Sequence, residues 1–183
     1  MKILFIYACV RNESRTLCLA QDFLGRLQGD VKELDLQTAN LFPLTRETLA
    51  LRETLTQEQA WEHPMFQLAC EFASVDHIVI AAPYWDLGFP ALLKCYLEAV
   101  TVAGITFTYS DGKPVGLCRA KKLTYLTTAG GKIFADYGYA YVKSLSQNLY
   151  GIAATECYFV ENTDVLGITN QTLFEIADIQ YKQ

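Results

Sequence analysis

Ser14, Arg15 and Thr16 form the first of three segments whose residue types suit ligand binding. They open a predicted helix, and the first N–H groups of a helix have no carbonyl partner within it. Together with two hydroxyl groups and the guanidinium groups of Arg11 and Arg15, these N–H groups can hold a phosphate. The same residues also fit an ordinary helix cap flanked by solvated arginines, so this segment alone leaves both interpretations open.

An aromatic segment bracketed by prolines is the second candidate. An apolar run ends at Ala82, and a second proline stands at position 90. After Ala82 the chain reads Pro83, Tyr84, Trp85, Asp86 and Leu87. The prolines exclude this segment from a central strand or a helix interior, so the aromatic rings lie on a stiff loop. A flat aromatic ligand suits such a loop, because backbone groups meet its edge while the rings cover its face.

A glycine pair provides the third segment. Thr128 ends a buried run, and Gly130 and Gly131 follow it. Glycines let the backbone pass close to a flat ring and present N–H groups to oxygen atoms at the ring edge. Taken alone, the pair fits a simple turn equally well.

The elements that position these segments follow from hydrophobic periodicity. Apolar runs predict strands at 2–9, 31–36, 77–82, 122–128 and 155–160. Helical patterns predict helices at 15–27, 47–74 (interrupted at Pro64), 90–102, 139–150 and 170–181. A hairpin is expected around Asp111 and Gly112.

Strands that are apolar on both faces and separated by helices predict an α/β protein with a parallel sheet covered on each side. Right-handed crossovers favour a five-stranded, three-layer sandwich with strand order 2-1-3-4-5. In that order the three candidate segments all follow strands at the same edge of the sheet. They are therefore expected to meet in one cleft.

Composition limits the class of protein. The chain has 183 residues, of which 51% are hydrophobic, and this predicts one domain over 1–183. A net charge of -5 and scattered basic residues argue against a nucleic acid or an anionic membrane as partner. No apolar run is long enough to cross a bilayer, so a cytoplasmic location is expected. Widely spaced cysteines predict buried, reduced thiols, and two isolated histidines predict no metal site.

Two other uses of such a sheet conflict with the residues. A dinucleotide-binding domain needs Gly-x-Gly-x-x-Gly after the first strand, where this chain has Ala-Cys-Val-Arg-Asn-Glu over 8–13. A phosphate-accepting receiver domain needs acidic residues at the ends of strands one and three. Those positions hold Ala8, Cys9, Ala81 and Ala82.

Four ordered motifs, at 14–16, 82–94, 104–109 and 127–131, resemble those of FMN-dependent NAD(P)H:quinone reductases and azoreductases, a family with a flavodoxin-like fold. The likeness spans most of the chain and implies one FMN-binding domain. It implies that the serine turn holds the FMN phosphate, the aromatic loop lines the flavin ring and the glycine pair meets its pyrimidine edge. The expected cofactor-binding residues are Arg11, Ser14, Arg15, Thr16, Pro83, Tyr84, Trp85, Asp86, Leu87, Thr128, Gly130 and Gly131.

The resemblance further implies an alternating reaction. NADH or NADPH gives a hydride to FMN and leaves, and a flat quinone, azo or related aromatic acceptor then takes its place. The chemistry stays on the cofactor, so no catalytic side chain is expected. Phe107 and Tyr109 project from one face of the hairpin and either cover the acceptor or fill a small core of their own. The helix over 90–102 is apolar nearly all round, which predicts either a homodimer interface or burial within the monomer.

Two further functions stay open at this point: a non-enzymatic flavodoxin-type electron carrier and an apo scaffold or interaction protein of the same fold. Carriers usually have Thr-x-Thr-Gly-x-Thr after the first strand, and this chain does not. Asp86 stands where many family members have asparagine. Some members have a histidine just beyond the glycine pair, where this chain has Lys132. The orientation of Asp86 and Lys132 toward the flavin stays open as well.

Overall fold

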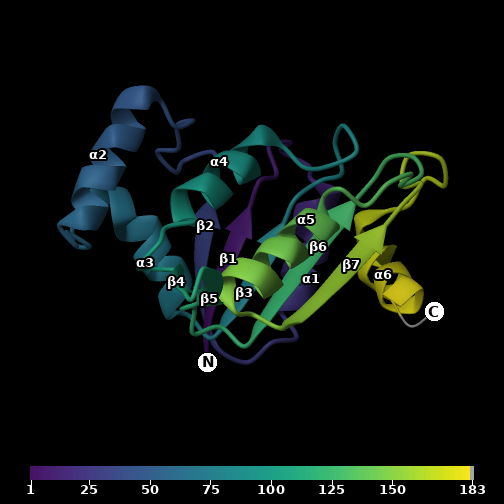
Figure 1. The fold of residues 1–183 in the computed structure, drawn as a ribbon. Coiled ribbons are helices and arrows are strands. Elements are labelled where there is room, and N and C mark those ends of the chain that lie inside the picture. The colour runs from purple at the N-terminus through teal and green to yellow at the C-terminus, as the bar shows by residue number, and fades with distance from the viewer. Residues whose placement is uncertain (182–183) are drawn as a thin grey trace.

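A parallel five-stranded sheet forms the centre of the computed structural model, which describes residues 1–181 (Figure 1). Its strands are β1 (Lys2–Tyr7), β2 (Asp30–Asp35), β3 (His77–Ala81), β6 (Lys122–Thr128) and β7 (Ala154–Val160). They lie in the order β2-β1-β3-β6-β7, and each pairs in parallel with its neighbour. This confirms the predicted 2-1-3-4-5 order, because β4 and β5 belong to a separate hairpin.

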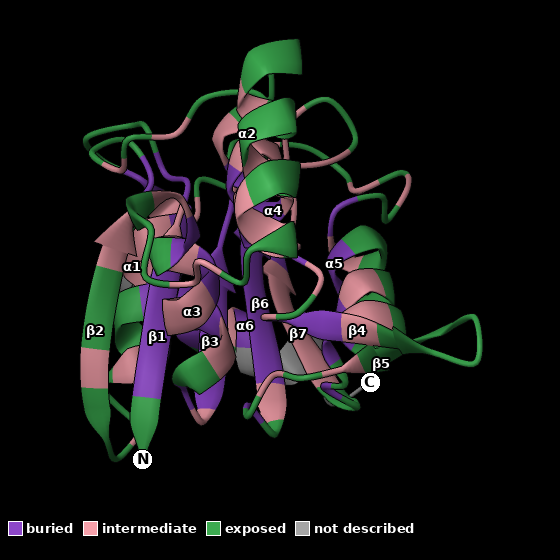
Figure 2. Ribbon diagram, turned by 60° about the vertical axis from the view of Figure 1, so that its left-hand side comes forward, coloured by how far each residue is buried: buried purple, intermediate pink, exposed green. Residues whose placement is uncertain are grey.

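Helices cover both faces of the sheet. One face carries α1 (Arg15–Leu24) and α6 (Leu173–Tyr181), and the other carries α3 (Gln67–Ser74), α4 (Ala91–Val100) and α5 (Tyr139–Leu145). Figure 2 shows the middle strands β3 and β6 almost wholly buried between these layers. Apolar side chains alternate between two cores along these strands because successive residues of a strand face opposite sides.

Backbone conformation and proline explain where the long helical stretch divides. The sequence predicts helix over 47–74 with an interruption at Pro64, and the structure has α2 (Arg46–Gln57), a 3₁₀ turn (Pro64–Phe66) and then α3. Gln59 adopts a left-handed φ of 54°, which an α-helix cannot accommodate. Thr45 caps the start of α2 through a reciprocal bond pair with Thr48.

Other predicted helices are shorter than their patterns suggest. α1 ends at Leu24, and the amide of Gly25 bonds back to the Gln21 carbonyl. The pattern over 139–150 divides into α5 and a π-helical turn (Ser146–Tyr150), which ends at Gly151 with a φ of 76°. A left-handed residue at that point is a common helix terminator.

The predicted hairpin is present beside the sheet. It consists of β4 (Phe107–Ser110) and β5 (Lys113–Gly116), which pair antiparallel. Asp111 and Gly112 form its turn with φ angles of 51° and 73°. Two consecutive left-handed residues match the twist of a two-residue hairpin, which is why Asp-Gly is favoured there.

Helix α2 stands apart from the layers. It projects from one end of the molecule, and none of its residues is buried (Figure 1). Its Arg52 guanidinium donates to the Glu98 carbonyl oxygen of α4 at 3.1 Å, and Leu55 packs against the main core. The helix is therefore held at the side of α4 by few contacts.

The cysteines agree only partly with the prediction of buried thiols. All are free, and Cys9 is buried, whereas the others are half-buried: Cys18, Cys70, Cys95, Cys118 and Cys157. The prediction was wrong for that second group, because apolar neighbours in sequence do not place a residue in the centre of a layer. Over residues 1–181 the helices are too short or too polar for any of them to cross a membrane.

Candidate functional site

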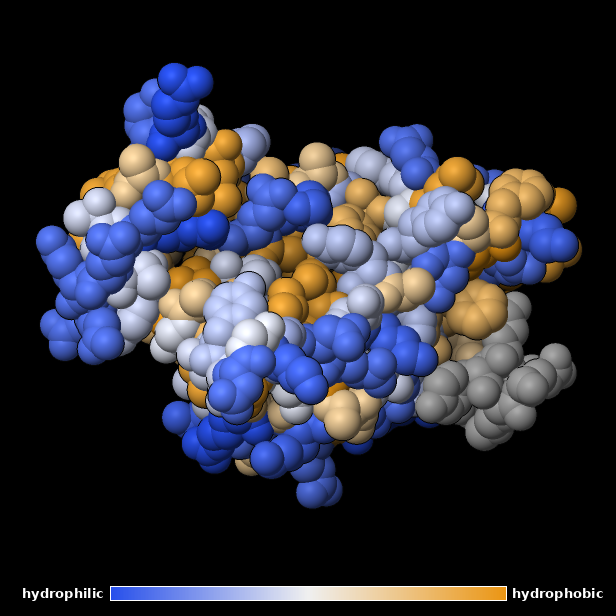
Figure 3. Space-filling view, viewed as in Figure 1, coloured by the Kyte–Doolittle hydropathy of each residue, from blue (hydrophilic) through white to orange (hydrophobic). Residues whose placement is uncertain are grey.

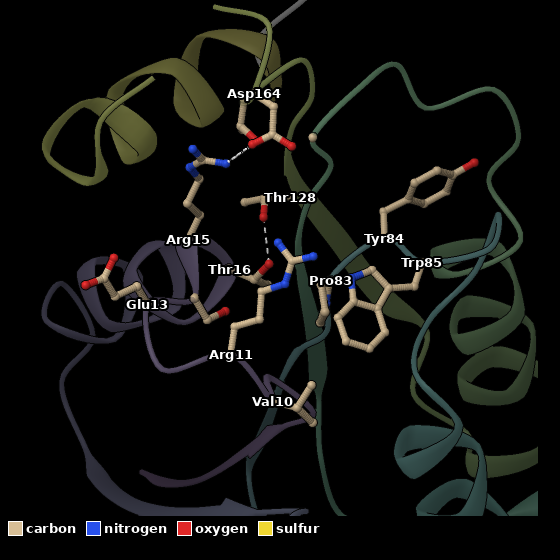
Figure 4. Close-up of a pocket in the computed structure, with 13 residues that line it drawn as sticks. Val10, Arg11, Glu13, Arg15, Thr16, Pro83, Tyr84, Trp85, Thr128 and Asp164 are labelled. Atoms are coloured by element: carbon tan, nitrogen blue, oxygen red, sulfur yellow. Dashed lines mark hydrogen bonds and ion pairs between the residues drawn. The ribbon is translucent and has the colours of Figure 1, made fainter. Parts of the chain in front are cut away.

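A pocket of about 180 Å³ opens at the carboxyl edge of the sheet (Figure 4). The loops after β1, β3, β6 and β7 all contribute to it, as expected for a switch point between β1 and β3. Among the predicted cofactor-binding residues, those that line the pocket are Arg11, Ser14, Arg15, Thr16, Pro83, Tyr84, Trp85, Thr128 and Gly130. Asp86, Leu87 and Gly131 belong to the same loops but do not line it.

Ser14 shapes the wall of the pocket at the start of α1. Its side-chain oxygen accepts the Leu17 amide at 3.2 Å, and its carbonyl accepts the Cys18 amide at 3.0 Å. Within the helix, the N–H groups of Arg15 and Thr16 have no carbonyl to bond, as at any helix start. These two N–H groups and the Ser14 hydroxyl proton make this wall suitable for an anion.

Thr16 and Thr128 join the start of α1 to the end of β6. Their hydroxyl oxygens lie 2.7 Å apart in a shared hydrogen bond, and both residues are buried. A buried bond between two elements distant in sequence fixes the spacing of the two loops. The Thr16 hydroxyl is therefore engaged with the protein itself.

Charged groups of both signs surround the opening. Arg11 lies over the ring of Trp85, with its guanidinium carbon 5.9 Å from the ring centre. Arg15 forms an ion pair with Asp164 and also donates to the Thr163 hydroxyl at 3.2 Å. Figure 4 shows the Arg15 and Asp164 side chains meeting across the top of the pocket.

Sequence reasoning placed the segment 11–16, which includes Glu13, in the cleft, but it missed three other lining residues: Val10, Thr163 and Asp164. Thr163 and Asp164 follow β7, the last strand of the sheet. Because all parallel strands end at one edge, the loop after the fifth predicted strand could have been added to the site. No binding motif marks that loop in the sequence.

The loop after β3 closes into a tight turn. Trp85 and Gly88 exchange backbone hydrogen bonds of 3.2 and 2.8 Å, which leaves Asp86 and Leu87 at the tip. Both tip residues are left-handed, with φ angles of 51° and 67°. Aspartate tolerates that conformation, but leucine adopts it at a cost. Stored strain of this kind often occurs in loops that bind ligands.

The two glycines after β6, Gly130 and Gly131, differ in the space around them. Their carbonyl oxygens accept the amides of Asp164 and Asn162 at 3.0 and 2.9 Å, which ties the glycine loop to the loop after β7. A Cβ atom on Gly130 would lie 2.1 Å from the Asp164 carboxylate, whereas one on Gly131 would meet nothing within 4 Å. A side chain at position 130 would thus displace the exposed Asp164 carboxylate, whereas Gly131 borders open space.

The hairpin aromatics lie away from this pocket. Phe107 and Tyr109 pack edge to face with ring centres 5.4 Å apart, so they do share one face of the hairpin. Phe107 is buried, while Tyr109 is 64% exposed. Neither lines the pocket within this chain.

A doubly wound parallel sheet with an anion pocket at its switch point defines a flavodoxin-like α/β protein. The model of the family with the flavodoxin-like fold matches residues 1–182, and the chain belongs to this family. The resemblance seen in the sequence motifs is thereby confirmed.

Relatives of known name are similar over nearly the whole chain. An FMN-dependent NADH:quinone oxidoreductase of Clostridium perfringens is 32% identical over 177 residues, covering 91% of this chain and 89% of that protein. A protein of the same name from Lachnoclostridium phytofermentans is 33% identical over 180 residues, covering 91% and 88%.

Solved structures support the fold. An azoreductase from Bacillus anthracis superposes with a TM-score of 0.82 at 23% identity and covers 100% of both chains. An FMN-dependent NADH-azoreductase of the same species, solved in complex with FMN, gives a TM-score of 0.79 at 20% identity and covers 99% of this chain and 95% of that one.

Proposed function

We propose that this chain is an FMN-dependent oxidoreductase that transfers two electrons from NADH to quinones or related flat aromatic acceptors such as azo compounds. The anion pocket built by Ser14 and its neighbours at the switch point carries this proposal. The names of the relatives at 32% and 33% identity support the same cofactor, donor and acceptor class. On this proposal residues 1–183 act as one FMN-binding domain in the cytoplasm.

The pocket fits the phosphate end of FMN. It offers hydroxyl and N–H donors from the start of α1, and Arg11 and Arg15 supply positive charge. Its volume of about 180 Å³ lies below the ~300–1,000 Å³ of sites that enclose a whole small molecule. The flavin ring would therefore lie outside it, against the loop of Pro83 and Trp85.

Loop geometry supports the placement of that ring. Gly131 borders open space, so a flat group can approach its backbone closely. Trp85 reaches the pocket from the other side, and the Arg11 guanidinium lies over its ring. These residues would orient the ring edge-on to the glycine loop and cover one of its faces.

When bound, FMN would supply two-electron redox chemistry, with the nicotinamide donor and the acceptor occupying the same place in turn. The chain itself would hold the ring, keep one face open and present N–H groups of the glycine loop to its pyrimidine oxygens. The names of the relatives favour NADH over NADPH as donor.

A homodimer through α4 completes the proposal. Leu93, Tyr96 and Leu97 face the core, whereas Cys95 and Ala99 lie outside the core cluster on the opposite side. Hydrophobic side chains reach the surface between α4 and α5 in Figure 3. A partner seated there would cover this surface and stand beside the acceptor position.

Ala99→Arg should yield a monomer by sedimentation, while Leu166→Arg, on the exposed loop after β7, should not.

One spectrum tests the function. We expect the purified full chain, incubated with FMN and freed of excess, to show visible flavin absorption that NADH bleaches without oxygen and a quinone restores. Gly131→Leu should abolish the flavin absorption while the free energy of unfolding of the FMN-free chain stays unchanged, because its side chain enters open space. A colourless wild-type protein would refute the proposal. A coloured protein that NADH cannot bleach would identify an electron carrier instead.

A further inference from the structure

A second, larger cavity lies on the other side of Tyr84. It measures about 540 Å³ and extends between the carboxyl halves of β6 and β7 and the segment over 132–139. Tyr84 is the residue that its lining shares with the phosphate pocket. Figure 4 shows the Tyr84 ring pointing away from Arg11 and Thr16. We call this space the β6–β7 cavity.

Two residues that line the β6–β7 cavity carry a buried hydroxyl group without a hydrogen-bond partner in the protein. These hydroxyl groups are Tyr125 Oη and Thr127 Oγ1, both on β6. Tyr125 is 1% exposed and Thr127 is 6% exposed. Among the side chains that the structure describes, only Tyr96 Oη is orphaned and buried in the same way. A buried polar group without a partner is costly, so two of them in one cavity point to a ligand that completes their bonds.

The protonation state of the groups in the cavity indicates which polar group a ligand needs. Burial raises the pKa of Tyr125 well above its ordinary value, and burial raises the pKa of the neighbouring Cys157 thiol as well. Both groups therefore keep their protons at neutral pH, and Tyr125 can act as a donor. The matching ligand group is a neutral oxygen that accepts, such as a carbonyl or a phenolic hydroxyl.

The rest of the lining favours an uncharged ring. Phe159, Tyr139 and Ile133 supply apolar surface, and charged groups come from Lys132, Asp136 and Glu161. An anion would meet two carboxylates there and one ammonium group. A flat aromatic molecule with a single polar end suits such a lining best.

Two hydrogen bonds fix the segment over 132–139, which lines one side of the cavity. The Glu161 carboxylate accepts the Ile133 amide at 2.9 Å, and the Tyr84 hydroxyl donates to the Ala135 carbonyl at 3.0 Å. Bonds from two different loops hold this segment in place. The cavity is therefore formed before any ligand enters, which reduces the ordering that binding requires.

We propose that the β6–β7 cavity is a second ligand site, separate from the phosphate pocket, for an uncharged aromatic molecule whose hydroxyl or carbonyl oxygen bonds Tyr125 and Thr127. This site does not depend on FMN. A molecule seated there would touch Tyr84 and would thus lie next to the first pocket.

Calorimetric titration of the full chain with 1-naphthol tests this site, because that probe is neutral and cannot accept electrons from a flavin. We expect one naphthol per chain, with the same affinity in the presence and absence of saturating FMN. Tyr125→Phe and Thr127→Val should each weaken binding by about three- to tenfold, the range for loss of one hydrogen bond. Neither change removes a bond within the protein, so neither should lower the urea midpoint.

Tyr96→Phe is the matched control. It removes the third orphaned hydroxyl, which does not line the cavity, and should leave naphthol affinity unchanged. Cys157→Phe should fill the cavity and abolish binding. The proposal is overturned if wild-type protein does not bind naphthol, if both hydroxyl variants bind it as well as wild type, or if FMN competes with it.

Discussion

The Arg15 guanidinium of α1 is paired with the Asp164 carboxylate from the loop after β7, across the opening of the phosphate pocket. Asp164 thereby neutralises a positive charge that an anionic ligand would use. Both side chains are partly exposed, at 33% and 63%, so solvent weakens the pair. A phosphate that binds in the pocket therefore has to displace the Asp164 carboxylate from Arg15 or share the guanidinium group with it.

Asp164→Asn should therefore strengthen FMN binding. The substitution keeps the shape that packs against Gly130 but removes the competing negative charge. We expect the dissociation constant to fall by about two- to fivefold at low salt, the usual range for an exposed ion pair, and the gain to shrink at high salt. Fluorescence titration of the flavin measures it. Weaker binding in this variant would show instead that Asp164 is needed to hold Arg15 in place.

Ser14 has two functions that a pair of variants can separate. Ser14→Ala removes the cap on the Leu17 amide and should cost about 0.5–2 kcal/mol of stability, besides weakening FMN binding by about 1.5–3 kcal/mol. Ser14→Asp retains a good cap, so the FMN-free protein should keep its stability within about 0.5 kcal/mol. Its carboxylate would face the phosphate and repel it.

Urea unfolding of the FMN-free proteins and flavin titration measure these two effects independently. If Ser14→Asp binds FMN as tightly as wild type, the phosphate does not lie at the start of α1, and the placement of the cofactor is wrong.

Leu87 stores strain that glycine should relieve. Its φ of 67° is costly for leucine, and its side chain is 44% exposed, so little packing is lost on truncation. We expect Leu87→Gly to raise the free energy of unfolding by about 0.5–1 kcal/mol in urea, after the entropic cost of glycine is subtracted. Asp86→Gly is the comparison, since aspartate already tolerates a left-handed φ and should gain less. Equal losses in both variants would mean that the turn is not strained.

Much of the pocket was predictable because it depends on local patterns joined by topology. Apolar runs located the strands, right-handed crossovers set their order, and the order brought the segments of Ser14, Pro83 and Gly130 to one edge. Each of these steps rests on periodicity and chirality. None of them requires knowledge of how side chains pair.

The features that the sequence did not show are pairings between distant side chains. The bond between Thr16 and Thr128 joins residues 112 positions apart, and that between Arg15 and Asp164 joins residues 149 positions apart. No local signal specifies such partners. The left-handed Leu87 was missed for a different reason, because leucine is disfavoured there and the turn geometry prevails over its preference.

A buried histidine at the opposite end of the sheet should make stability depend on pH. His77 is 4% exposed on β3, and its Nε2 lies 2.9 Å from the Thr124 hydroxyl. That hydroxyl donates to Glu156 at 2.7 Å, so it accepts from His77, and Nε2 carries the proton. Burial lowers the pKa of His77 below 6.5, Lys122 lowers it further, and Glu156 opposes them.

Because the pKa of His77 is lowered by folding, the unfolded chain binds the proton more readily. The contribution of His77 to stability is thus complete above pH 6.5 and is lost as the pH falls from there toward the folded-state pKa. His77→Gln can still donate to Thr124 but does not titrate. Urea unfolding between about pH 5 and 8 should show the wild-type free energy falling on the acid side relative to that of His77→Gln. Lys122→Gln should reduce this fall, since it removes one of the groups that lower the pKa. Parallel pH profiles for wild type and His77→Gln would show that burial of His77 does not disfavour its charged form.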